Sequence, residues 1–183
     1  MADQPAVFTV GHGARSAAEL VAVLRAAGVG ELVDIRRHPG SRRHPQFGRE
    51  ALAAALGRAG IGYRWEGEAL GGRRSARADS RHTALGGHAL AGYADHMDTV
   101  DFRSAVDAIV ARAATARPAI MCAETDWTHC HRMLVADAVA MRGARVTHLV
   151  TPGRSEPHRP HPTASRGGDG WPVYDMPDTI PGT

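Results

Sequence analysis

Sulfur, carboxylate and basic side chains crowd one short stretch of this sequence. Cys122 and Glu124 follow a strongly apolar segment, and the run Cys130-His131-Arg132 comes shortly after them. A thiol in the first turn of a helix and near an arginine loses its proton readily, so we expect Cys130 to react faster than Cys122. Glu124, at the end of a strand, is placed to act as a general acid or base. The stretch therefore predicts a catalytic group in which either cysteine is the nucleophile or shapes the pocket, with Arg132 and His131 binding an anion.

Three other interpretations of these residues stay open. Cys122 suits a small core position, and Cys130 suits a buried, inert one. A metal site of both thiols with His131 and His12 is the third, although Cys-x7-Cys-His is not a standard zinc spacing. A disulfide between the cysteines is not expected in a reducing compartment, although a strand end and the next helix start can bring them close.

A second basic cluster follows the apolar segment that ends near Asp34. Arg36 and Arg37 come directly afterwards, and Arg42 and Arg43 lie in the same polar loop. A carboxylate in an apolar strand is costly unless it is paired, so Asp34 either forms a structural pair with an arginine or orients an arginine or a catalytic group. The arginines repel one another unless a negative group is near, which predicts an anion-binding rim.

Gly11, His12 and Gly13 lie between another apolar segment and Ser16, which is placed to cap a helix. This arrangement predicts either an anion cradle of backbone N–H groups at the helix start or an ordinary tight turn from strand to helix. It lacks the full glycine fingerprint of a dinucleotide site. Asp34 or His12 is also a candidate for proton transfer, together with Glu124.

Alternating strands and helices are needed to bring these residues together. Apolar segments with β-branched residues predict five strands, and amphipathic spacing with capping signals predicts the helices between them. The strands are expected at 6–10, 31–35, 61–65, 118–123 and 146–150, and the helices at 17–27, 49–59, 102–117 and 128–141. This alternation predicts an α/β three-layer sandwich with a mostly parallel, Rossmann-like sheet in which 118–123 is central. Ligands bind beyond the carboxyl ends of such strands, which is where the candidate residues fall.

The chain is expected to have one domain and a tail. Residues 1–151 form the predicted α/β domain, and 152–183 form a C-terminal tail rich in proline, glycine and arginine. Within that tail, 152–170 is expected to be flexible and 171–174 to dock back. The pattern weakens over 66–92, which predicts a long surface loop, and loops of that length are usually functional or mobile.

The composition excludes several classes of protein. With 43% hydrophobic and 22% charged residues among 183, the chain is not expected to be disordered, and two cysteines are too few for a disulfide scaffold. No apolar run reaches the roughly 20 residues that cross a bilayer, and the N-terminus lacks the basic start of a secretory signal. A cytoplasmic protein with no membrane partner is therefore expected. All 22 basic residues are arginine, so arginine forks, backbone amides or histidines would hold any bound anion.

Several motifs together carry a resemblance to a known family. They are Thr9-Val-Gly-His12, Val33-Asp-Ile-Arg36, Pro39-Gly-Ser-Arg42, Pro45-Gln-Phe47, Gly62-Tyr63, Leu70-Gly-Gly72, Tyr93 to Met97, Met121-Cys-Ala-Glu124 and Cys130-His-Arg132. With these motifs, the chain resembles domain-of-unknown-function family 488 (DUF488) from about residue 8 to residue 149. Members often have Gly-His-Ser where this chain has Gly11-His12-Gly13, so a hydroxyl that contacts a ligand in relatives would be missing here. The resemblance implies a fold and a site but no reaction.

Function then rests on the chemistry of the predicted site. The preferred hypothesis is a small enzyme of the hydrolase or glycosyl-transfer type, acting on an anionic small molecule such as a nucleotide or nucleoside. The alternative is a non-catalytic module that binds a nucleotide or nucleic acid, or a Cys/His metal-binding protein. Nucleic acid is not favoured, because carboxylates do not help to bind phosphates and only 5% of residues are aromatic. No cofactor is firmly implied.

Overall fold

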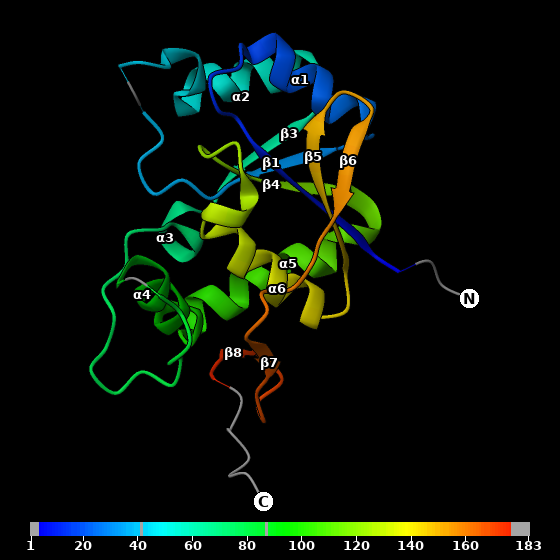
Figure 1. The fold of residues 1–183 in the computed structure, drawn as a ribbon. Helices are drawn as coiled ribbons and strands as arrows, with labels where there is room; N and C mark the ends of the chain where they lie inside the picture. Colours follow the sequence, from blue (N-terminus) through cyan, green and yellow to red (C-terminus); the bar gives the residue numbers. More distant parts are fainter. Residues whose placement is uncertain (1–3, 41, 87, 177–183) are drawn as a thin grey trace, which may run out of the picture.

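The computed structural model describes residues 4–40, 42–86 and 88–176 and has a six-stranded central sheet (Figure 1). The strands are β1 Ala6–Gly11, β2 Glu31–Asp34, β3 Gly62–Trp65, β4 Pro118–Cys122, β5 Arg145–Thr151 and β6 Arg154–Pro157. Their order across the sheet is β3-β2-β4-β1-β5-β6, with β1 to β5 parallel and β6 antiparallel to β5. The expected parallel sheet with 118–123 at its centre is thus confirmed, with one strand more than predicted.

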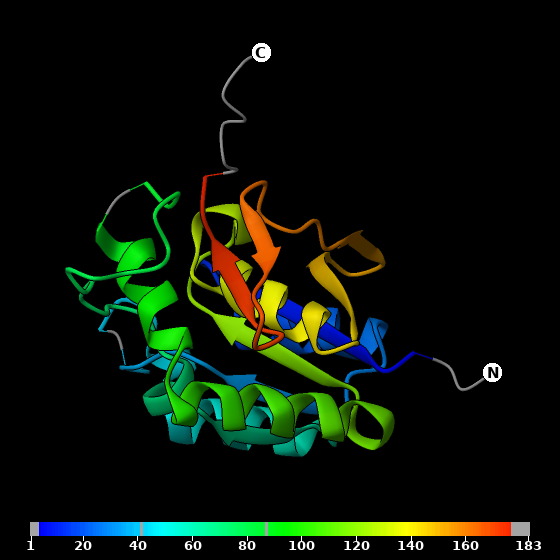
Figure 2. The same cartoon turned by 90° about the horizontal axis from the view of Figure 1, so that it is seen from below.

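Helices cover both faces of the sheet, as the three-layer prediction requires. On one face lie α1 Ala17–Ala26 and α2 Arg49–Arg58, with the 3-10 turn η1 Pro45–Phe47 beside them. On the other face lie α3 Gly67–Leu70, α4 His88–Met97, α5 Val100–Ala116 and α6 Arg132–Met141 (Figure 2). The predicted long loop over 66–92 is thus shortened at its two ends by α3 and α4.

Local signals explain where several elements begin and end. The Ser16 hydroxyl accepts from the backbone N–H of Glu19, whose carboxylate accepts from the Ser16 N–H, so the predicted capping box starts α1. Gly28 follows α1 with a φ of 66°, a left-handed conformation that glycine adopts without strain. Thr99 caps α5 in the same way as Ser16, by accepting from the backbone N–H of Phe102.

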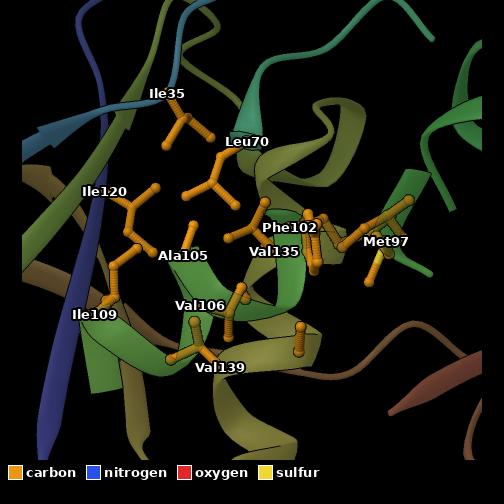
Figure 3. Packing of buried hydrophobic residues seen from close by; sticks show 14 of the residues in the cluster. Ile35, Leu70, Met97, Phe102, Ala105, Val106, Ile109, Ile120, Val135 and Val139 are labelled. Carbon is orange, nitrogen blue, oxygen red and sulfur yellow. The ribbon is translucent and has the colours of Figure 1, made fainter. Parts of the chain in front are cut away.

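The larger of the two hydrophobic cores lies between the sheet and α5 and α6. Figure 3 shows Ile120 of β4 meeting Ile109 and Val106 of α5 and Val139 of α6. Each of these four side chains is completely buried. Burial of an aliphatic side chain is worth about 1.5–3 kcal/mol, so this layer anchors β4 and the residues that follow it.

The connections leave the sheet in opposite directions around β4. The helices after β1 and β2 cover one face, whereas the helix after β4 covers the other, and β4 lies between β2 and β1. Chain segments therefore diverge at the carboxyl end of β4 and leave a crevice there. In open α/β sheets this is the place where ligands bind.

The C-terminal segment differs from the flexible tail expected at 152–170. Residues 154–157 form β6 on the edge of the sheet, and β7 Ala164–Arg166 pairs with β8 Pro172–Tyr174 in a small hairpin. The predicted docking of 171–174 is confirmed, because Trp171 and Tyr174 are buried against the core. Proline and glycine mark the turns of this segment rather than disorder. The last part of the expected tail, 177–183, lies outside the described residues.

A buried hydrogen-bond network attaches this segment to α6 and β1. The Asp137 carboxylate accepts from the Tyr174 hydroxyl at 2.9 Å and binds His158 Nε2 at 2.8 Å. His158 Nδ1 lies 3.0 Å from His148 Nε2, and His148 Nδ1 lies 2.6 Å from the Thr9 hydroxyl. A buried carboxylate must be paired to be tolerated, so these partners make Asp137 compatible with the core.

No helix in the described ranges is long and apolar enough to cross a membrane.

Replacing Tyr174 by Phe tests the network. The variant keeps the ring but leaves one oxygen of the buried Asp137 carboxylate without its donor, so the free energy of unfolding should fall by about 1.5–3 kcal/mol. Ser165→Ala, on the exposed surface of the same hairpin, should change it by less than about 0.5 kcal/mol. Urea unfolding measures both values, and equal values for the two variants would show that the hydroxyl is not needed.

Candidate functional site

A cavity of about 280 Å³ opens at the carboxyl ends of β2 and β4, in the crevice described above. Its lining is Arg36, Arg37, His38, Gly72, Arg73, Cys122, Ala123, Glu124, Cys130 and His131. Both motifs that the sequence singled out, the one after Asp34 and the one after β4, therefore meet in one place. Basic side chains and one carboxylate therefore share the lining with the two thiols and with apolar surface.

The wall on the β2 side is held by a buried ion pair. Asp34 is completely buried at the end of β2, and its two oxygens accept from Arg36 Nε at 2.9 Å and Nη2 at 2.6 Å. The Tyr63 hydroxyl of β3 donates to the same carboxylate at 2.8 Å. Arg36 Nη2 also donates to the carbonyl of Phe47 in η1 at 2.8 Å. Both interpretations of Asp34 hold, because it forms a structural pair and by doing so orients an arginine.

His12 completes this group as a neutral hydrogen-bond acceptor. Its Nε2 accepts from Arg36 Nη1 at 3.3 Å, and its Nδ1 donates to the Gly13 carbonyl at 2.9 Å. The ring stacks on Phe47 with centroids 4.2 Å apart. Burial lowers the pKa of His12 to about 4, so the ring carries no charge near neutral pH. His12 does not line the cavity and positions Arg36 instead.

The glycines at 11 and 13 do not form the expected anion cradle. The backbone N–H groups of His12 and Gly13 donate to the carbonyls of Cys122 and Ala123, so they are not free for a ligand. A Cβ at Gly11 would lie 1.9 Å from the Glu124 carbonyl oxygen, which requires glycine. The turn therefore holds the end of β1 against the segment after β4.

The two thiols contact each other in the wall of the cavity. Cys122 Sγ lies 2.8 Å from Cys130 Sγ, and both residues are buried. The hydrogen bond from Cys130 lowers the pKa of Cys122, and the same bond raises the pKa of Cys130. Cys122 is thus the thiol that loses its proton, and Cys130 is the donor that keeps it.

The expected placement of Cys130 in the first turn of a helix is wrong. Residues 127–129 form the 3-10 turn η2 (Trp127–His129), and α6 begins only at Arg132. Cys130 therefore precedes the helix, and its sulfur accepts from the Arg132 backbone N–H at 3.4 Å. Asp126 caps the start of η2 by accepting from the Thr128 N–H.

Arg132 lies behind the thiols rather than on the cavity surface. It is 1% exposed, and its Nη2 donates to the Thr125 carbonyl at 3.3 Å. Its Nε and Nη1 have no hydrogen-bond partner among the described residues. A buried guanidinium favours a nearby negative charge, and the charge of Arg132 contributes to the lowered pKa of Cys122. Arg132 is therefore a counter-charge for the thiolate.

The other predicted residues divide into two groups. Glu124, Arg37 and His131 line the cavity, and Glu124 is exposed to solvent. Burial lowers the pKa of His131 to about 4, so it faces a ligand as an uncharged ring. Arg42 is exposed and does not line the cavity.

Four lining residues were not among the predicted site residues, namely His38, Gly72, Arg73 and Ala123. Arg73 has a φ of 62°, a left-handed conformation that is uncommon outside glycine and often marks functional loops. Its carbonyl accepts from Arg37 Nη1 at 3.2 Å, which joins the two sides of the cavity mouth. Gly72 and Arg73 belong to the long loop predicted at 66–92, and Gly72 also belongs to the Leu70-Gly-Gly72 motif of the family resemblance.

The structure does not assemble the predicted Cys/His metal set. In the described part of the chain, donor atoms of His, Cys, Asp and Glu gather in metal-like geometry only at His82, Asp95 and Asp98. That cluster is away from the cavity lining, and Asp98 is already within ion-pair distance of Arg81 and Arg103. The positive charges of these arginines therefore compensate the carboxylate that a metal cation would need as a ligand.

Comparison with known proteins identifies one match. A family model described as Domain of unknown function DUF488 matches residues 16–139, which include β2, β4 and the start of α6. No curated protein and no solved structure matches the chain.

Timed alkylation tests the assignment of the thiolate. With limiting iodoacetamide at pH 7, Cys122 should be labelled before Cys130, because its proton is the one that is lost more easily. Peptide mass spectrometry locates the label. Cys130→Ala removes the hydrogen bond to Cys122 and should slow its labelling several-fold, whereas Cys130→Ser keeps a donor and should slow it less. Labelling of Cys130 first would contradict the assignment.

Acid should destabilise the protein through its buried neutral histidines. Between pH 6.5 and 4 the unfolded chain binds protons on His131 that the folded chain does not, so stability is lost as pH falls through this range. At pH 5 this histidine alone accounts for about 2 kcal/mol. Urea unfolding at pH 7.5 and 5 should show a smaller difference for His131→Gln than for wild type. The exposed His38→Gln is the control, and an equal reduction in both variants would refute the assignment.

Proposed function

Because the chain belongs to the DUF488 family, whose description assigns no activity, we propose its function from the candidate site itself. The protein is an enzyme of the hydrolase type that acts on a small molecule carrying a phosphate or carboxylate group, such as a nucleotide. Cys122 is the nucleophile, Glu124 transfers the proton, and basic residues of the cavity bind the anionic group.

One observation carries the proposal: the contact of the Cys122 and Cys130 thiols in the cavity wall, with Arg132 buried behind them. A hydrogen bond from Cys130 and the charge of Arg132 both favour the Cys122 thiolate. Thiolates are strong nucleophiles, and enzymes activate them with neighbouring donors and positive charges. A purely structural cysteine has no need of this arrangement.

The charges around the cavity support an anionic substrate. Arg37 and Arg73 line the mouth, and neither forms an ion pair with a carboxylate in the described ranges. Guanidinium groups bind phosphate and carboxylate through paired charge-assisted hydrogen bonds. A cavity of about 280 Å³ is near the lower end of ligand sites, which favours a small molecule over a polymer.

The residues present suffice for a two-step hydrolysis. The Cys122 thiolate attacks the electrophilic carbon or phosphorus of an ester, the bond to the leaving oxygen breaks, and the Glu124 carboxyl group gives that oxygen a proton. The Glu124 carboxylate then takes a proton from water, whose oxygen attacks the thioester or thiophosphate and releases Cys122 as thiolate. In this scheme Asp34 and His12 position Arg36 and exchange no proton.

The competing function is a non-catalytic module that binds an anion with the same arginines. Glu124 argues against it, because a carboxylate in the cavity weakens phosphate binding without contributing to it. A measurement of turnover distinguishes the enzyme from the binding module, because only the enzyme converts its ligand.

Generic esters test the proposal directly. With p-nitrophenyl phosphate and p-nitrophenyl acetate, the wild type should release a burst of p-nitrophenolate no larger than the enzyme concentration, followed by slower turnover. Cys122→Ala should abolish the burst, and Glu124→Gln should lower kcat by roughly 10²–10⁴-fold. Asp126→Asn removes an exposed carboxylate of the same loop that does not line the cavity, so it should leave turnover unchanged.

Two results would refute the enzyme. One is turnover that survives in Cys122→Ala. The other is wild-type protein that binds inorganic phosphate by calorimetry yet hydrolyses neither ester, which would establish the binding module instead.

A further inference from the structure

The two thiols are placed to form a bond with each other. Cys122 is the last residue of β4, and Cys130 lies in the turn before α6. The short segment between them folds back so that the two side chains meet. Their sulfur atoms are 2.8 Å apart, about 0.8 Å longer than a disulfide bond. The two sulfur atoms therefore need to approach each other by less than 1 Å to reach bonding distance.

The pair is also chemically asymmetric, as a reactive dithiol must be. Both thiols line the cavity, and Cys122 is the thiolate of the pair. Cys130 keeps its proton and lies directly beside that sulfur. In thiol–disulfide exchange the first residue attacks and the second resolves the mixed disulfide.

We propose that Cys122 and Cys130 form a reversible dithiol–disulfide couple whose oxidant is a small disulfide bearing carboxylates, of the glutathione disulfide type. The inference rests in part on the proposed function, because closing the disulfide consumes the nucleophile and switches hydrolysis off. The carboxylates of such a reagent suit the basic mouth formed by Arg37 and Arg73.

The exchange balances without any further reactant. The Cys122 thiolate attacks one sulfur of the reagent, whose S–S bond breaks and releases one thiolate. That thiolate takes the proton of Cys130, and Cys130 sulfur then attacks Cys122 sulfur and releases the second half of the reagent as thiolate. The protein is oxidised by two electrons, and the reagent is reduced to one thiol and one thiolate.

Arg132 makes this disulfide easy to reduce again. Its buried guanidinium has two nitrogens without partners among the described residues and is stabilised by the Cys122 thiolate. The disulfide has no negative charge, so oxidation leaves Arg132 without its counter-charge. An interaction present only in the reduced form shifts the equilibrium toward that form.

Intact mass and thiol counts with oxidised glutathione test the couple. The chain has two cysteines, so both measurements report on this pair alone. Folded wild type should lose both free thiols and two hydrogens in mass, with no attached glutathione, and millimolar dithiothreitol should restore it. Cys130→Ser should retain one glutathione on Cys122, because the resolving thiol is gone. Cys122→Ser should remain unmodified.

Several outcomes would overturn the couple. They are a glutathione adduct that persists on wild type, faster modification of Cys122→Ser than of Cys130→Ser, disulfide-linked dimers, or no reaction of folded wild type. If Cys122→Ser does not fold, as judged by circular dichroism, the results for wild type and Cys130→Ser still test the couple. The thiol count needs no turnover, so a protein that closes the disulfide but hydrolyses no ester refutes the proposed function and leaves the couple standing. Hydrolysis that persists after the thiols are lost refutes the switch.

Discussion

The buried ion pair between Asp34 and Arg36 is the interaction on which the site depends. One guanidinium contacts the end of β2 through Asp34, η1 through the Phe47 carbonyl and the turn after β1 through His12. Tyr63 adds β3 to the same carboxylate. Removing one partner of a buried ion pair typically costs about 3–5 kcal/mol, because the other charge is left uncompensated. The segment that carries Arg37 and His38 into the cavity starts from this anchored point.

A second buried arginine serves the opposite purpose. The donors of Arg36 are largely taken up by protein acceptors, which makes it part of the framework, whereas Arg132 keeps two nitrogens without partners in the described part of the chain. An uncompensated buried charge is costly, and the structure places an ionisable thiol beside it. Burial of the Arg132 charge is unfavourable, and the negative charge of the Cys122 thiolate offsets part of this cost. The same charge interaction favours the thiolate, which is the reactive form of Cys122. Arg36 follows β2, and Cys122 ends the neighbouring strand β4. The register between these two strands therefore sets the distance between the arginine and the thiol.

Much of the fold and the location of the site could be predicted from local signals. The capping box at Ser16 and Glu19, the apolar strand Pro118–Cys122 and the polar residues after each strand are properties of short segments, and the structure has all of them. The C-terminal strands were not predictable in this way. Their stability comes from Asp137, which lies on α6, and from the buried ring of Tyr174, so no local pattern marks them.

The sequence by itself therefore determined the first five strands, their parallel arrangement and the edge of the sheet where chemistry-bearing residues gather. Only the tertiary structure decided which groups each of those residues contacts there. It places Cys122 rather than Cys130 as the thiolate, because a thiol's proton affinity depends on its donors and nearby charges in space. It also assigns Arg36 to Asp34 and brings Arg73 into the cavity from a loop far along the chain. Hydrogen bonds and charges act over a few ångströms regardless of sequence separation, and only the folded chain sets those distances.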